Sequence, residues 1–202
     1  MSSEPSSIRR LALSRHYDAA LEKGALLVAV ARCRLTDREP LYELRSRHHV
    51  QLVELLHDFC YQARKAIELA EQYEPGMIDH ATRINMPGYN ERVAEMGMEG
   101  SVPLADESLW WVLGRVIHSR DVLVREREVV EVSSAWAAAP HTTSYWSPVV
   151  FAVSSDRDGG MDRHHVQAER VVETFLALRQ RFDRALLAAH EDPHEDVHRG
   201  LA

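Results

Sequence analysis

The feature that most constrains this chain is a seven-residue hydrophobic repeat within residues 41–73. Steps of four and three residues separate its apolar positions, which are Leu52, Leu56, Phe59, Ala63, Ala66, Ala70 and Tyr73. This spacing places all of them on one stripe of an α-helix, as in helices that pack antiparallel in a bundle. Pro75 and Gly76 predict the end of the helix. The stripe must be buried, and other helices are its natural partners.

Two further segments repeat the helical spacing. Residues 7–35 carry the stripe Leu13, Tyr17, Leu21, Gly24, Val28, Ala31 and Leu35. Residues 161–190 carry the stripe Ala168, Val171, Phe175, Leu178, Phe182, Ala185 and Ala189. Because a glycine inside a helix costs about 1 kcal/mol of helix propensity, we expect a neighbouring helix to approach closely at Gly24.

The hydrophobic periodicity changes between the helices predicted at residues 41–73 and 161–190. Asp106 is a good N-cap for a further helix that reaches about Arg125. Residues 129–136 and 148–153 are short and rich in valine and aromatic residues, which predicts two strands of a β-hairpin joined by residues 137–147. We therefore predict a mainly α protein, an up-down four-helix bundle with a β-hairpin inserted between its third and fourth helices.

The 202 residues, 45% of them hydrophobic, are enough for one domain with its own core. We place this domain at residues 8–190, with the hairpin at 128–155, a flexible tail at 1–7 and a polar tail at 191–202. Residues 75–105 show no period, which is typical of a long functional loop and makes them a candidate contact for a protein partner.

Composition limits the classes of partner. A net charge of −7 argues against a surface that holds nucleic acid throughout, but it allows a local arginine patch. No apolar run approaches the ~20 residues that cross a bilayer, so no membrane partner is expected. The two cysteines, Cys33 and Cys60, fit a reducing compartment, and we expect a cytoplasmic protein.

Histidines gather at one end of the predicted bundle. The second and fourth helices of an up-down bundle run parallel, so their N-termini lie at the same end. His48 and His49 lie there on the second helix, and His165 and Glu169 lie there on the fourth. Histidines one turn from a carboxylate can chelate a divalent transition metal, as in a metal-dependent bundle enzyme. A polar bundle end without any cofactor is the alternative.

The helix predicted from Asp106 has two apolar sides. Trp111, Arg115 and His118 share the side opposite its main stripe. Such a helix is usually buried on both sides, and a homodimer interface would bury the second one. Coverage by residues 75–105 is the alternative. The dimer face and the loop at residues 75–105 would be sufficient for a non-catalytic, dimeric interaction module, which is an alternative function.

The helical order, the hairpin before the last helix and the sequence GRVIHS at residues 114–119 resemble members of the HEPN superfamily. In that family an Arg and a polar residue are followed, several positions later, by a His around the start of the last helix, and Arg157, Asp158 and His164 match this order.

The resemblance implies a dimeric helical protein that binds or acts on RNA. Such a protein is either a metal-independent endoribonuclease or an inactive relative, in a bacterial defence or toxin–antitoxin system. Arg157 would stabilise the phosphate charge, and His164 would transfer a proton from the ribose 2′-hydroxyl.

Overall fold

The computed structural model describes residues 6–33, 42–86, 89–92, 101–103, 107–133, 141–155 and 162–191. Within these ranges the helices are α1 (Ser6–Ala31), α2 (Tyr42–Ala70), α3 (Met77–Arg83), α4 (Leu109–Ile117), α5 (Ala168–Leu176) and α6 (Arg179–Glu191). The strands are β1 (Asn85–Met86), β2 (Tyr89–Arg92), β3 (Ser101–Pro103), β4 (Glu107–Ser108), β5 (Ser119–Ser133), β6 (His141–Ser155) and β7 (Asp162–Val166). The prediction of a mainly helical chain is confirmed.

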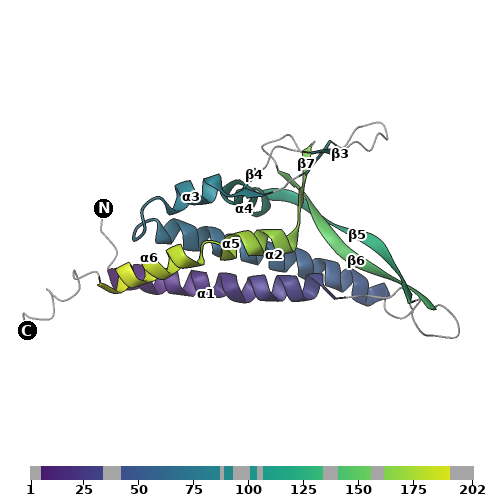
Figure 1. Cartoon of the computed structure of the whole chain (residues 1–202), viewed down its shortest axis with the longest axis horizontal. Helices are drawn as coiled ribbons and strands as arrows, with labels where there is room; N and C mark the ends of the chain where they lie inside the picture. Colours follow the sequence, from purple (N-terminus) through teal and green to yellow (C-terminus); the bar gives the residue numbers. More distant parts are fainter. Residues whose placement is uncertain are drawn as a thin grey trace, which may run out of the picture.

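The two long helices α1 and α2 lie side by side along most of their length (Figure 1). The repeat that predicted α2 is buried as expected, with six of its seven positions in the core and Tyr73 partly buried just beyond the helix end. Among the described residues no helix is long and apolar enough to cross a membrane.

The last helical segment packs against this pair in two pieces, α5 and α6. Every position of its predicted stripe is buried, although Ala177 and Leu178 form a turn between the two helices. The aromatic rings of the stripe meet those of α1 and α2. The ring of Phe175 lies edge-on to Phe59 with centroids 5.7 Å apart, and Phe182 stacks on Tyr17 at 4.4 Å.

Gly24 lies where three helices meet. A Cβ atom at this position would lie 3.1 Å from Cε2 of Phe59 and 3.2 Å from Cγ1 of Val172, which belong to α2 and α5. The predicted close approach at Gly24 is therefore confirmed. Glycine allows these helices to pack closer than any side chain would.

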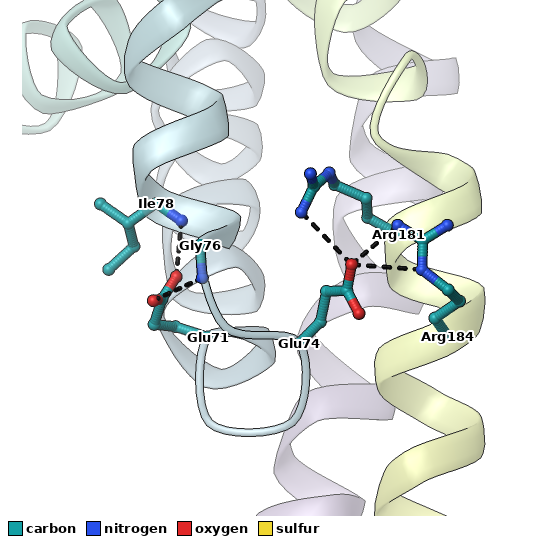
Figure 2. Close-up of polar contacts among 6 residues, drawn as sticks. All are labelled: Glu71, Glu74, Gly76, Ile78, Arg181 and Arg184. Atoms are coloured by element: carbon teal, nitrogen blue, oxygen red, sulfur yellow. Dashed lines mark hydrogen bonds and ion pairs between the residues drawn. The ribbon is translucent and has the colours of Figure 1, made fainter.

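The end of α2 is fixed by two carboxylates (Figure 2). Glu71 accepts hydrogen bonds from the backbone N–H groups of Gly76 (2.9 Å) and Ile78 (2.7 Å), and Gly76 adopts the left-handed φ of 85° that glycine tolerates best. Glu74 pairs with Arg181 and with Arg184 (2.7 Å) of α6. One turn therefore orients α3 and also ties α6 to α2.

The structure corrects the helix predicted from Asp106 to about Arg125. Helix α4 is only nine residues long, begins after the N-cap Ser108 and ends at Ile117. From Ser119 the chain is strand β5, which pairs antiparallel with β6 from Ser119↔Ser155 to Ser133↔His141. Strand pairing with a distant segment overrides the local helical pattern here. Asp106 lies outside the described residues.

Strands β5 and β6 form a long twisted ribbon beside the helices (Figure 1). Each has fifteen residues, more than the sequence segments that predicted them. They belong to a five-stranded sheet of order β3-β2-β7-β6-β5, and β1 and β4 form a separate pair. Residues 134–140 of the predicted connection lie outside the described residues.

Two further predictions are corrected by this sheet. Residues 75–105 are not one irregular loop, because they contain α3 and strands β1, β2 and β3. Residues 162–166 are strand β7 rather than the start of the last helix, because β7 is hydrogen-bonded between β2 and β6. The predicted tails fall mostly on residues 1–5 and 192–202, outside the described residues.

We predict that Gly24→Leu destabilises the protein. A leucine must displace Phe59 and Val172, and overpacking costs about 1–3 kcal/mol, more than the ~1 kcal/mol gained in helix propensity. Urea unfolding followed by circular dichroism should show the loss. Ala25→Leu, at the adjacent exposed position, is the control and should stay within about 0.5 kcal/mol of the parent protein. A Gly24→Leu protein as stable as its parent would contradict the close approach.

Candidate functional site

The described surface is hollowed beside α4. This hollow, here called the α4 groove, has a volume of about 410 Å³. Helix α2 contributes Arg64 to it, α3 contributes Thr82, and Ser108 caps α4 beside it. The remaining lining residues belong to α4 and its C-cap and are Trp110, Trp111, Gly114, Arg115 and His118. Cationic, aromatic and hydroxyl side chains therefore share one cavity.

Two arginines of the groove lie over tryptophan rings. The guanidinium carbon of Arg64 is 4.1 Å from the ring centroid of Trp110, and that of Arg115 is 4.6 Å from the ring centroid of Trp111. Each such cation–π pair contributes about 0.5–1 kcal/mol at an exposed site.

Arg64 is held in place from several sides. Gly114 is buried against it, and a Cβ atom on residue 114 would overlap Nη1 of Arg64. The Arg64 guanidinium also donates to Glu68 (3.2 Å), which accepts a second bond from Lys65 (2.6 Å). Burial raises the pKa of the Glu68 carboxyl, but the bonds from Lys65 and Arg64 outweigh it and hold that pKa below its usual value. Glu68 therefore stays charged and anchors Arg64.

A histidine–serine pair joins α2 to the end of α4 next to the groove. The Ser119 hydroxyl donates to the backbone oxygen of Val116 (2.7 Å), so Nε2–H of His57 donates to Ser119 Oγ (3.2 Å). Burial lowers the pKa of His57, and the nearby Asp58 carboxylate opposes this shift. His57 lies seven residues before Arg64, on the same side of α2, so α2 contacts both ends of α4.

The residues predicted as a dimer face line the α4 groove. Trp111, Arg115 and His118 lie on one side of α4 and its C-cap, as their spacing predicted, with Trp111 and Arg115 partly buried and His118 exposed. Sequence reasoning missed Arg64, Thr82, Ser108 and Trp110 as members of the same site. Gly114 within an apolar helix was the one local signal of a close approach there.

The residues predicted as catalytic are only partly described. Arg157 and Asp158 lie outside the described residues. His164 lies in strand β7, where its register partners are Asn90 of β2 and Val153 of β6, and not in the first turn of a helix. The place predicted for His164 is therefore wrong, and its predicted role stays a prediction.

The residues predicted as metal ligands have other contacts. Nε2–H of His48 donates to the backbone oxygen of Val30 (2.8 Å), and Glu169 accepts a 2.6 Å bond from Arg32, which holds the pKa of this carboxyl below its usual value. The ring of His49 lies 6.3 Å from that of His48. His165 lies in β7, opposite Tyr89 and Ala152, rather than in a helix.

The structure brings His48 and Glu169 to the same end of α1. Within the part of the chain that is described, no three His, Cys, Asp or Glu side chains come close enough to hold a metal ion.

Comparison of the chain with protein-family models, with curated proteins and with solved structures finds no match. The site must therefore be interpreted from its own chemistry.

We predict that His57 makes stability depend on pH. Because burial lowers the pKa of folded His57 below its usual 6.5, the unfolded chain binds the proton more tightly. The stabilisation is complete above about pH 7 and is lost as the pH falls through about 6.5 toward the folded pKa. Free energies of unfolding measured between about pH 7 and 5 should fall less in His57→Gln than in the parent protein.

Ser119→Ala is the control for this measurement. It removes the hydroxyl but keeps the imidazole, and burial is the main cause of the shift, so most of the pH dependence should remain. Equal slopes in His57→Gln and the parent protein would show that His57 is not responsible.

Proposed function

We propose that this protein binds single-stranded RNA through the α4 groove. The observation that carries the proposal is the pairing of two arginines with two tryptophans around one cavity. Sites for single-stranded nucleic acids combine these elements, with aromatic rings and guanidinium planes for the bases and cations for the backbone. Stacking of one base on an aromatic side chain contributes about 1–3 kcal/mol.

The dimensions of the groove favour a single strand. Its volume of about 410 Å³ lies in the range of small-ligand pockets, so it suits an unstacked base and not a duplex. A net charge of −7 makes the rest of the surface a poor partner for phosphates. Binding should therefore depend on few phosphate contacts and fall only modestly with salt.

The resemblance to HEPN proteins supports the same class of ligand, since many of them act on RNA. In a catalytic relative of these proteins, Arg157, Asp158 and His164 would cleave the RNA, whereas an inactive relative would only bind it.

A homodimer through Trp111, Arg115 and His118 is a competing use of the same face. A dimer that dissociates in Trp111→Glu, together with no RNA binding, would replace the proposal by an interaction module.

We predict that Trp111→Ala and Arg115→Gln each weaken RNA binding about tenfold or more, because each removes one member of the cation–π pair. Fluorescence anisotropy with a labelled single-stranded RNA measures the change in Kd. Arg170→Gln is the matched control, since Arg170 is exposed on α5 outside the groove and its substitution should leave Kd unchanged. Wild-type affinity in both groove variants would refute the site.

We predict that RNA cleavage, if the protein is a HEPN-type nuclease, proceeds in excess chelator and disappears in Arg157→Ala and His164→Ala. Both variants should keep the RNA affinity of the parent protein, because neither residue lines the described groove. Gel analysis of a labelled RNA provides the readout. Cleavage by both variants would reject these catalytic residues. Cleavage that requires added metal and is lost in His165→Ala would favour the metal-dependent enzyme instead.

A further inference from the structure

We infer that two copies of this chain associate through the exposed side of α1, with the two helices antiparallel. The inference is carried by the apolar and charged residues on this side and by the order in which they follow one another along the helix. It does not depend on RNA binding, and it concerns a different surface from the α4 groove.

The exposed residues of α1 all lie on one side of the helix. From Ile8 to Ala31 they are Ile8, Leu11, Arg15, Asp18, Glu22, Ala25, Leu26 and Ala29, here called the α1 face. Apart from the adjacent pair Ala25 and Leu26, the steps between them are three or four residues, so they cover only about 100° of the helix circumference. In Figure 1, α1 (purple) runs along the lower border of the molecule.

Both ends of the α1 face are apolar. Leu11 is 70% exposed, the largest exposed fraction of any large hydrophobic residue that the structure describes, and Ile8 is exposed one turn before it. Leu26 is exposed near the other end of the helix, between Ala25 and Ala29. Association that removes these side chains from water is favourable, and exposed apolar groups of this kind mark contact surfaces.

The middle of the α1 face is charged and carries both signs. Arg15, Asp18 and Glu22 follow one another at successive turns. Asp18 accepts a hydrogen bond from the Ser14 hydroxyl (3.2 Å). Within the described part of the chain, Arg15 and Glu22 have no ion-pair partner. The charges of these two side chains are therefore available to a second molecule.

The order of the charges selects an antiparallel second copy. When two α1 helices pair antiparallel with their centre near Asp18, Arg15 of each copy lies opposite the turn between Asp18 and Glu22 of the other. Each ion pair then occurs twice, because the arrangement has a two-fold axis. A parallel pair would instead place Arg15 opposite Arg15 and Glu22 opposite Glu22. Like charges that face each other across an interface are unfavourable.

The same register brings the apolar ends together. Ile8 and Leu11 near the start of one helix lie opposite Leu26 and Ala29 near the end of the other. The charged centre therefore fixes the register, and an apolar contact on each side of it excludes water. This matching of a face with its own reverse is the pattern expected of an isologous dimer.

A dimer through α1 leaves both α4 grooves open. Helix α4 packs against α2 and α3, and it lies on the side of the molecule opposite α1 (Figure 1). A dimer through Trp111, Arg115 and His118 would instead cover the groove of each copy. The two kinds of dimer therefore respond to different substitutions.

The test is sedimentation velocity on the full chain, without RNA, across a concentration series. Arg15→Glu and Glu22→Arg should each weaken the dimer about tenfold or more, because each reverses a charge at two symmetry-related places. Leu11→Glu should weaken it at least as much, since it places a charge in an apolar contact. All three residues are exposed, so the circular dichroism spectrum should stay that of the parent protein.

A mixture of the two charge variants tests the antiparallel register. The Arg15→Glu protein carries acidic side chains at both positions, and the Glu22→Arg protein carries arginines at both. Only a mixed pair places opposite charges against each other. An equimolar mixture should therefore form heterodimers at a concentration where each variant alone is mainly monomeric. A mixture that stays monomeric there would overturn the register.

Arg83→Glu is the matched control. Arg83 is an exposed arginine on α3, away from α1 (Figure 1), and its reversal should leave the dimer unchanged. A parent protein that is monomeric at every concentration overturns the inference and leaves the α1 face to a different partner. A dimer that withstands Arg15→Glu and Leu11→Glu but dissociates in Trp111→Glu overturns it as well and assigns the interface to α4.

Discussion

The packing of Phe59 against Gly24 and Phe175 is the constraint on which the helical core depends. It joins α1, α2 and α5 at one point, because the absence of a side chain at residue 24 lets the Phe59 ring reach the backbone of α1. Full burial of a phenylalanine side chain contributes about 1.5–3 kcal/mol, and its neighbours Leu56 and Cys60 are equally buried. Helix α2 is thereby fixed in position and rotation.

Once α2 is fixed, its opposite side positions the groove. His57 and Arg64 lie two turns apart on that side. His57 contacts Ser119 just after the end of α4, and Arg64 contacts Gly114 and lies over Trp110 near the start of α4. The groove is therefore held by the core and not by a loop, which limits the freedom of the arginine that lies on Trp110. A short helix of nine residues can present ligand-binding side chains in a defined geometry only with such support.

The net charge of the molecule is negative, whereas the α4 groove is lined by the cationic side chains of Arg64 and Arg115. In the RNA binding that we propose, an acidic chain would gain little from long-range attraction to phosphates, so affinity would come from short-range stacking and a few directed hydrogen bonds. Anchoring Arg64 through Glu68 and Lys65 serves this purpose, because a fixed guanidinium loses less conformational entropy when a ligand binds. The same arrangement would confine the proposed binding to the α4 groove.

The sequence by itself determined the helical stripes, since the apolar spacing that buries α1, α2 and the α5–α6 segment is local and read directly from residues such as Leu52 and Phe175. It also placed Trp111, Arg115 and His118 on one side of α4. Only the tertiary structure decided that residues 162–166 are a strand, because β7 takes its hydrogen bonds from β2 and β6, which are remote in sequence. Likewise, Arg64 meets Trp110 only after α2 and α4 pack, and no local pattern carries that contact.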